Sequence, residues 1–351
     1  MSRLVAFIHR CLSQTARAAV WLACATGFGC AVMAPRSEPV LVKRAQMHMG
    51  TVVTITAVAP TEATAQAAVA AGFREVRRLE ELLSTWIPTS ELSRVNAAAG
   101  RHPVKVSPET FTVLKRSLEI AALTEGGFNI AIGPAMEAWN VTERARIPDE
   151  TELQALRPLV DLSQVWLDET ASTAFLSIPG MRVDVGGIGK GYAADLVVQA
   201  MQRAGAVAGA VALSGDIKTF GRLPDGSRFP VGIRHPRKEG AVLAWVELQD
   251  EAISTAGDYE RFFERDGVRY HHILDPATLH PARSCQSVTV IAREGMMADG
   301  LDTGIFVLGP EQGMALVERL PDVEAVIVDH RGRVFVSSGL AGRIHLVPES
   351  D

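Results

Sequence analysis

The sequence predicts an α+β protein with largely antiparallel or mixed sheets and packed helices. Helix-like and strand-like segments are interspersed, without the strict alternation of strand and helix that a doubly wound parallel sheet requires. Several strand-like segments follow one another directly between residues 229 and 257. No Pro/Gly/Ser-rich linker divides the body of the chain. We therefore expect one large domain over residues 40–348, either undivided or with two lobes.

The composition is that of an ordinary globular protein. Of 351 residues, 47% are hydrophobic and 21% are charged, which is enough to build a sizeable core. The formal net charge is −5 and no basic run is present, which argues against a body that binds nucleic acid. After residue 34 the only cysteine is Cys285, so the body can form neither an intrachain disulfide nor a cysteine-rich metal site.

The first 34 residues differ from the rest of the chain. They contain Arg3, Arg10 and Arg17 and no acidic residue, so the chain without them carries a net charge of −8. The apolar run at 18–33 is shorter than the roughly 20 residues that a membrane span needs. This pattern is typical of a secretory signal peptide, with an N-terminal membrane anchor as the alternative. We expect an exported, periplasmic protein that is either released by cleavage or held at the inner membrane.

The first half of the body is expected to begin with a strand and two helices. Residues 49–59 are rich in β-branched side chains and predict a strand. Apolar residues recur at three- and four-residue steps through 61–84, which predicts a helix. A second helix is expected at 108–126, where two glycines end it. After it we expect loops at 132–148 and strand-like pieces at 165–167, 174–178 and 182–185.

The second half is expected to contain runs of strands separated by helices. The first helix is expected at 191–205, directly after a glycine-rich stretch. Two further helices are expected at 296–309 and 313–321. Strands are expected at 210–221 with an internal turn, 229–236, 241–249, 252–257, 270–282 running into a loop, 287–293, 324–330 and 334–340.

The glycine-rich stretch "VDVGGIGKGYAAD" at 183–195 looks like a phosphate loop but fits neither common nucleotide motif. A Walker A loop would need glycine at Asp184 and Ser or Thr at Gly191, and the glycine spacing differs from the dinucleotide fingerprint. Backbone N–H groups at a helix N-terminus still form a natural anion site, and Lys190 would add a cation. The alternative is a tight turn between a strand and a helix.

The segment "ADGLDTGIF" at 298–306 places oxygen ligands on one helix face. Asp299, Asp302 and Thr303 are spaced at i, i+3 and i+4, so their side chains lie on the same side. Carboxylates and hydroxyls are hard oxygen ligands that suit Mg²⁺. The alternative is the start of a helix, with Asp299 as the N-cap.

Two further segments carry candidate functional side chains. In "RYHHILDP", alternation along a strand would send His271 and His272 to opposite faces, and either could act as a general base near neutral pH. A hydrogen-bonded structural histidine is the alternative. Trp86 lies in a Ser/Thr/Pro-rich loop, where it could stack on a flat ring or simply pack.

In combination, these motifs resemble the ApbE family of FAD:protein FMN transferases. The resemblance rests on seven segments in the family's order, spanning about residues 47–309. They are "MGTVVTI", "LSTWIPTSELSRVN", "GGFNIAIGPAMEAW", "VDVGGIGKGYAAD", "LSGDIKTFG", "ISTAGDYERFFERDGVRYHHILDP" and "SVTVIAREGMMADGLDTGIFVLG". The resemblance implies a T-fold-like domain that binds FAD with a divalent metal, usually Mg²⁺.

The implied reaction transfers the FMN half of FAD to a Thr or Ser hydroxyl of an exported or membrane electron-transfer protein, and releases AMP. Two other functions fit the same site. Water could replace the hydroxyl, which gives Mg²⁺-dependent hydrolysis of FAD to FMN and AMP. The protein could also bind flavin without turnover, as a maturation partner.

The resemblance also assigns roles to individual residues. The general base is expected from the chemistry instead: a base must take the hydroxyl proton, and we expect it to be His272, with His271 as the substitute and Asp275 orienting the ring. Asn129 departs from the family's usual Asp, and Ser214 from its frequent Gly before Gly215 and Asp216. The implied FAD contacts are Met49, Trp86, Gly127, Phe128, Asn129, Asp184, Lys190 and Ile273. The implied metal ligands are the Gly187 carbonyl, Asp299, Asp302 and Thr303.

Overall fold

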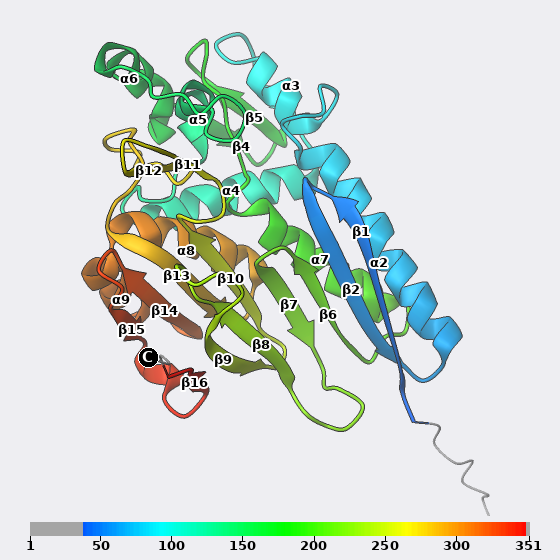
Figure 1. Cartoon of the computed structure of the whole chain (residues 1–351). Helices are drawn as coiled ribbons and strands as arrows, with labels where there is room; N and C mark the ends of the chain where they lie inside the picture. The colour runs from blue at the N-terminus through cyan, green and yellow to red at the C-terminus, as the bar shows by residue number, and fades with distance from the viewer. Residues whose placement is uncertain (1–37, 349–351) are drawn as a thin grey trace, which may run out of the picture. The chain divides into compact units, whose positions relative to one another are not determined.

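A computed structural model describes residues 38–348 of the chain, so the leader at 1–34 lies outside the described residues. The described part is built on an antiparallel sheet of eight strands in the order β1-β2-β6-β7-β10-β13-β14-β15 (Figure 1). These strands are Val40–His48, Thr51–Ala59, Ala208–Leu213, Asp216–Phe220, Ala252–Gly257, Cys285–Ala292, Val323–Asp329 and Val334–Val336. All of their pairings are antiparallel, which confirms the expected fold class.

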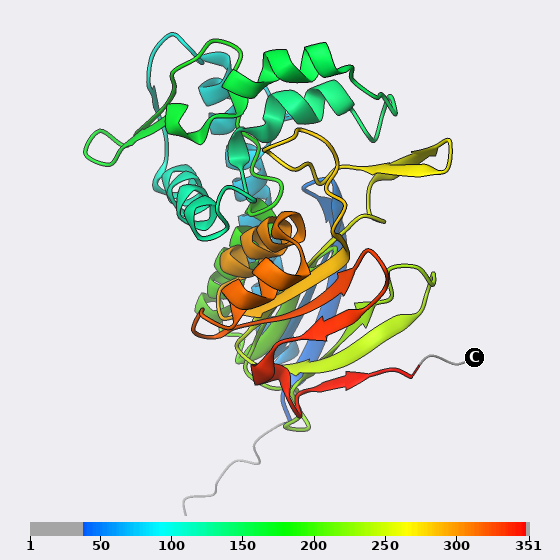
Figure 2. The ribbon, with the colours of Figure 1, turned by 90° about the vertical axis from the view of Figure 1, so that its left-hand side faces the viewer.

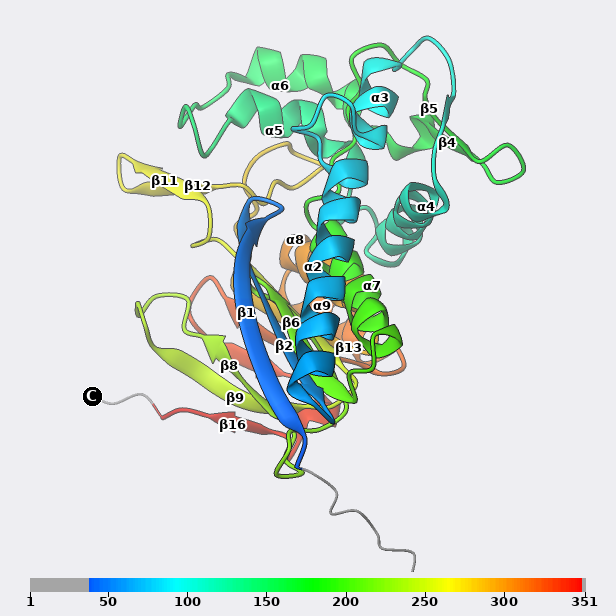
Figure 3. The same cartoon turned by 90° about the vertical axis from the view of Figure 1, so that its right-hand side faces the viewer.

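Four helices pack against one face of this sheet, as seen from the side in Figures 2 and 3. They are α2 (Glu62–Leu83), α7 (Gly189–Arg203), α8 (Gly295–Leu308) and α9 (Pro310–Val317). The sequence positions α2 clearly: Thr61 caps its first turn, and Ala65, Val76 and Leu79 are among the buried residues of one helix face.

A small three-stranded sheet covers the opposite face. Its order is β16-β9-β8, with β8 at Phe229–Arg234, β9 at Val242–Leu248 and β16 at Ile344–Leu346. Ile253 on β10 and Ile291 on β13 pack against the small sheet, whereas Ala252 and Val290 face the helices. Because successive side chains of a strand alternate between faces, one strand serves both layers. β13, with apolar residues on both faces, is buried along its whole length.

The chain between α2 and α7 builds a cap beyond one end of the large sheet (Figures 1 and 3). It contains helices α3 (Glu91–Ala97), α4 (Pro108–Leu123), α5 (Gly133–Trp139) and α6 (Glu150–Leu156). It also contains the sheet β3-β5-β4, made of Val104–Lys105, Thr173–Leu176 and Val165–Asp168. Short 3₁₀ turns lie at Ile130–Ile132, Arg157–Val160, Leu162–Gln164 and Ser338–Leu340.

A hairpin of β11 (Phe262–Arg265) and β12 (Val268–His271) projects away from the large sheet (Figures 2 and 3). Asp266 and Gly267 join its strands, with φ values of 52° and 75°. Two positive φ values in a two-residue loop define a type I′ turn, for which Asp-Gly is a preferred sequence.

The structure corrects several sequence expectations. Residues 132–148 are not only loop, because α5 lies within them. No strand forms at 182–185, and the strand expected to start at 270 ends at His271. β1 and β11 were not expected. β1 is an edge strand whose residues are mostly exposed, so it lacks the apolar alternation that identifies a half-buried strand.

From Pro39 onwards the chain forms a single compact unit. Within residues 38–348, no helix combines the length and the apolar character that crossing a membrane requires.

Candidate active site

A cavity of about 1130 Å³ lies where the cap meets the strand ends of the large sheet. It is lined from widely separated parts of the sequence, including the turn after β1, the loop after α2, the glycine loop, the β6–β7 turn and the segment around His272. Its volume exceeds that of an ordinary small-molecule pocket, so it suits a large ligand.

The glycine loop ends in the first turn of α7, where Gly191 is required by close packing. A Cβ on Gly191 would collide with the backbone oxygen of Gly295, where α7 and α8 touch. The Asp195 carboxylate on α7 accepts hydrogen bonds from the N–H groups of Gly295 (2.8 Å) and Met296 (3.0 Å) and so caps α8. The two helices are therefore locked together at their N-terminal ends.

A buried acidic cluster lies at this junction. Asp216 at the start of β7 joins Asp299 and Asp302 of α8, with one carboxylate oxygen from each lying within 4.8 Å of the others. None of the three is more than 4% exposed. Lys190 makes an ion pair with Asp216 and lies 3.6 Å from Asp299. Ser254 of β10 donates to the cluster, with its hydroxyl next to Asp216 and 2.6 Å from Asp302.

The cluster holds three carboxylates against one ammonium. Burial and the nearby Asp216 raise the pKa of Asp299 to about 7, although Lys190 opposes the rise. Burial and the two neighbouring carboxylates also raise the pKa of Asp302 well above its usual value. Burial would lower the pKa of Lys190, but the charges of Asp216 and Asp299 outweigh it and raise that pKa. The cluster therefore has an excess of buried negative charge that a divalent cation would neutralise.

The other expected metal ligands lie at the same place. Thr303 follows Asp302, and its hydroxyl donates to that carboxylate at 3.0 Å. A Cβ on Gly187 would lie 3.1 Å from the Thr303 hydroxyl, so the loop passes close to α8. Asp299 is not an N-cap, because α8 begins four residues earlier, at Gly295. The donor set of carboxylates, hydroxyl and carbonyl fits Mg²⁺.

The two neighbouring histidines point to different places, as alternation along the strand predicts. His271 is buried, its Nε2 donates to the Ala282 carbonyl (2.8 Å), and its Nδ1 accepts from the Ile273 N–H (3.3 Å). Burial lowers its pKa to about 4. Both ring nitrogens are used, so His271 has a structural role. His272 instead lines the large cavity.

The ring of His272 is oriented by a backbone carbonyl. Its Nδ1 lies 3.3 Å from the Arg261 oxygen, and its backbone N–H donates to the same oxygen at 3.1 Å. Since a carbonyl only accepts, Nδ1 carries the proton and Nε2 keeps its lone pair. No described residue hydrogen-bonds to Nε2. Burial, followed by the charge of Arg261, lowers the pKa of His272 to about 3, so the ring is neutral at pH 7.

Asp275 does not take part in this arrangement. Its carboxylate accepts from the Ala277 N–H (2.8 Å) and the Thr278 hydroxyl (3.0 Å) within its own turn. The expected contact between Asp275 and His272 is not among the hydrogen bonds of the described residues. The Arg261 carbonyl takes the orienting role that the sequence suggested for Asp275.

The expected flavin contacts lie around the rest of the cavity. Its lining includes all of them: Met49, Trp86, Gly127, Phe128, Asn129, Asp184, Lys190 and Ile273. Trp86 is 82% exposed at the rim, which leaves its ring free to stack. Asn129 is used by the fold, because its side chain caps the 3₁₀ turn at Ala131 (2.8 Å) and donates to the Val160 carbonyl (2.9 Å).

Sequence reasoning assigned no role to two residues of the site, Asp216 and Glu80. Asp216 completes the acidic cluster, and its position after Gly215 in a strand-turn-strand pattern could have suggested it. Glu80 on α2 lines the cavity and accepts from the Met49 N–H at 2.6 Å, which holds Met49 in a left-handed conformation with φ 49°. Ser214, a departure from the glycine that the resemblance implies, adopts φ 60°, a conformation that favours glycine.

Comparison with known proteins identifies the family. The model of the ApbE family matches residues 49–327. An FAD:protein FMN transferase of Treponema pallidum (strain Nichols) is 36% identical over 321 residues, covering 87% of this chain and 89% of that protein. One of Vibrio cholerae (strain O395) is also 36% identical, over 272 residues, covering 75% and 81%.

Solved structures agree with the sequence relatives. The flavin transferase ApbE from Vibrio cholerae superposes with a TM-score of 0.78 at 30% identity, covering 87% of this chain and 99% of that one. The ApbE protein from Thermotoga maritima gives a TM-score of 0.80 at 28% identity, with the same coverage. With the family motifs gathered around one cavity, the chain belongs to the ApbE family.

Proposed function

We propose that this protein is an FAD:protein FMN transferase that works with Mg²⁺ and modifies a Thr or Ser hydroxyl of an exported or membrane electron-transfer protein. The observation that carries the proposal is the pairing, in one cavity, of a buried acidic cluster with excess negative charge and a neutral histidine whose Nε2 is open. The relatives that share the family are flavin transferases.

The reaction needs a proton acceptor and a site for the pyrophosphate of FAD. The acceptor hydroxyl attacks the phosphorus on the FMN side, the new O–P bond forms, and the bond from that phosphorus to the bridging oxygen breaks to release AMP. His272 takes the hydroxyl proton on Nε2, since its Nδ1 proton is held by the Arg261 carbonyl. A bound Mg²⁺ would neutralise charge on the pyrophosphate.

The residues of the chain supply the rest. Asp216, Asp299 and Asp302 would hold the cation with Thr303 and the Gly187 carbonyl. Gly187 and Gly189 line the cavity at the start of α7, where backbone N–H groups favour anions. Trp86 at the rim would cover one ring of FAD.

The leader supports an exported location. Its charged head and apolar run of limited length are typical of a signal peptide or an inner-membrane anchor, and either would put the domain in the periplasm. The acceptor would then be a periplasmic or membrane flavoprotein.

The test is mass spectrometry of a Thr-bearing acceptor domain from an exported flavoprotein, incubated with this protein, FAD and Mg²⁺. We expect the acceptor to gain the mass of FMN while AMP is released. EDTA or Asp302→Ala should abolish the gain, whereas Glu169→Ala on the surface should not. Release of AMP from FAD without an acceptor would indicate a hydrolase. FAD binding with no release of AMP, whichever acceptor is added, would indicate a flavin-binding protein.

A further inference from the structure

The β11–β12 hairpin stands beside the proposed general base. β11 begins directly after Arg261, and β12 ends directly before His272; both of these residues line the cavity. The ring of His272 contacts the Arg261 carbonyl, so it lies at the base of β11. A polypeptide that runs along β11 would therefore end beside the cavity that Arg261 and His272 line.

The pairing pattern shows which backbone groups of the hairpin face outwards. A two-residue loop closes a hydrogen-bonded pair, here Arg265 with Val268. Hydrogen-bonded and non-hydrogen-bonded pairs alternate in an antiparallel ladder. Phe262 and Glu264 of β11 are therefore in non-hydrogen-bonded pairs, and their N–H and C=O groups point away from β12.

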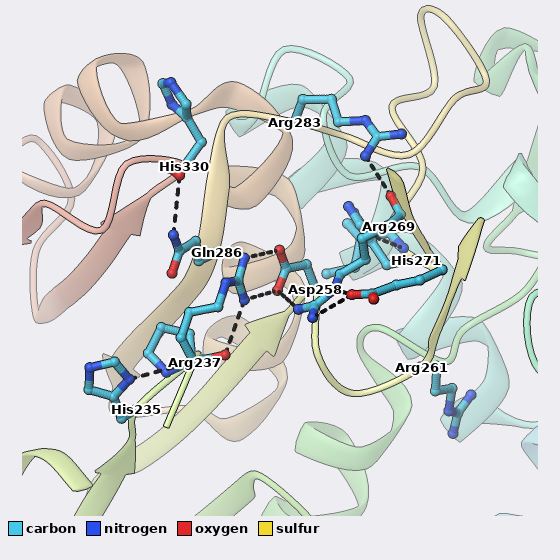
Figure 4. Close-up of polar contacts among 12 residues, drawn as sticks. His235, Arg237, Asp258, Arg261, Arg269, His271, Arg283, Gln286 and His330 are labelled. Carbon is cyan, nitrogen blue, oxygen red and sulfur yellow. Dashed lines mark hydrogen bonds and ion pairs between the residues drawn. The ribbon is translucent and has the colours of Figure 1, made fainter. Parts of the chain in front are cut away.

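The two edges of the hairpin differ. On the β12 side, the outward carbonyl of Arg269 accepts a hydrogen bond from the Arg283 guanidinium at 2.5 Å (Figure 4). On the β11 side, no described residue hydrogen-bonds to the outward backbone groups of Phe262 and Glu264. Both of these residues are exposed. The β12 edge is closed and the β11 edge is open.

The hairpin is also held in place before any partner arrives. Arg269 donates to Glu264 (2.9 Å) and to Asp258 (3.4 Å). The Asp258 carboxylate also accepts from the two terminal guanidinium nitrogens of Arg237, Nη1 and Nη2, at 2.7 and 2.6 Å (Figure 4). On the other face, Tyr270 stacks against Trp139 with 5.7 Å between ring centroids. A strand edge that is fixed in advance costs little entropy when a partner binds to it.

We propose that the acceptor protein docks by adding the segment that carries its target hydroxyl as a third strand along β11, paired with Phe262 and Glu264. This inference rests on the proposed function, because it concerns the partner of that reaction. Strand addition uses main-chain hydrogen bonds and is therefore tolerant of the acceptor's side chains. Its position would bring the hydroxyl to Nε2 of His272. β11 has only four residues, so the rest of the affinity must come from the cavity loaded with FAD.

The test compares Glu264→Pro with Glu264→Ala in the full chain. Both remove the pairing of Glu264 with Arg269, but only proline removes an outward N–H, and proline is tolerated at such an edge position. With the acceptor domain used above, we expect kcat/KM to fall about five- to tenfold further in Glu264→Pro than in Glu264→Ala, the equivalent of one hydrogen bond. FAD affinity, measured by flavin fluorescence, should be the same in both.

Hydrogen exchange of the wild-type protein gives a second measurement that needs no variant. With FAD and the acceptor bound, the amides of Phe262 and Glu264 should gain protection, whereas those of Phe263 and Arg265, already paired with β12, should change little. Equal kcat/KM in the two variants, or no added protection at Phe262 and Glu264, would overturn strand addition. Failure of the wild-type protein to modify any acceptor would instead overturn the proposed function.

Discussion

Two charged clusters of the described structure differ in burial and in charge balance. In the acidic cluster of the cavity, Asp216, Asp299 and Asp302 face the single ammonium of Lys190. In the cluster of Figure 4, which lines a separate pocket of about 300 Å³, Asp258 and Glu264 are matched by Arg237 and Arg269.

The strand β10 connects the two clusters, because Ser254 on it contacts the acidic cluster and Asp258 follows its last residue. The balanced cluster has a structural role, because its ion pairs hold the β11–β12 hairpin in place. The unbalanced cluster costs stability as it stands, since its carboxylates are desolvated and repel one another. The excess negative charge of the acidic cluster thus favours binding of a cation, whereas the balanced cluster needs no ligand.

The largest effect is expected at the unbalanced cluster. Asp302→Asn removes a proposed metal ligand, so FMN transfer should fall by about 1000-fold or more. The free energy of unfolding without metal should stay the same or rise, because one repelling carboxylate is gone. The measurements are transfer kinetics and urea denaturation in EDTA. A loss of stability comparable to that of a core mutation would show that the cluster is structural after all.

Substitutions of the two histidines should have different effects, because His272 lines the large cavity and His271 lines the small pocket beside the balanced cluster. His272→Ala should lower transfer about 100-fold or more through loss of the base. His271→Asn, which keeps hydrogen-bonding groups, should lower stability while the kcat of the folded enzyme stays within a few-fold of the wild type. Single-turnover assays and thermal unfolding measure the two effects. Equal losses of kcat in both variants would contradict the assignment.

The pH profile sharpens the same distinction. The folded-state pKa values of His272 and His271, about 3 and about 4, lie below the unfolded value of 6.5. The neutral forms are therefore favoured in the folded state, and stability should fall as pH drops below 6.5. Protonation of the base should not reduce transfer above pH 5. The prediction would be contradicted if the wild-type transfer rate fell as pH dropped through about 6.5 and this fall were absent from His271→Asn. The titrating group would then be His271 and not His272.

The balanced cluster should behave in the opposite way to the acidic one. Asp258→Asn removes the buried carboxylate that pairs with the partly exposed Arg237 and Arg269, and should lower the free energy of unfolding by about 2 kcal/mol. FAD affinity should be little changed, because Asp258 does not line the large cavity. As a control, Asp322→Ala breaks the exposed ion pair with Arg293 and should cost less than about 1 kcal/mol.

The smallest effect is expected at the rim of the cavity. Trp86→Ala should weaken FAD binding about tenfold, the equivalent of one lost aromatic stack, and should leave stability unchanged because the ring is exposed. Trp166→Ala, another exposed tryptophan outside the cavity, is the matched control and should not alter FAD affinity. Equal FAD affinity in the two variants would place the flavin away from Trp86.

The sequence predicted those parts of the candidate site whose chemistry requires particular side chains at a particular spacing. Asp299, Asp302 and Thr303 had to share one helix face, and the structure places them there. The glycine loop was visible as an anomaly, but the reason for Gly191 was not, because it lies in the contact with Gly295 about 100 residues away. The orienter of His272 was equally hidden, since any residue at position 261 supplies the same backbone carbonyl.

The sequence by itself determined the α+β class, the long amphipathic helix α2, most strands of the second half and the resemblance to the ApbE family. These depend on local periodicity and on side-chain chemistry that is written residue by residue. Only the tertiary structure decided that Asp216 joins the acidic cluster and that β11 leaves one edge unpaired. It also decided that both ring nitrogens of His271 are hydrogen-bonded within the fold, whereas Nε2 of His272 faces the cavity without a partner among the described residues. Each of these depends on contacts between segments far apart in the chain, or on the direction of backbone groups, which no residue type encodes.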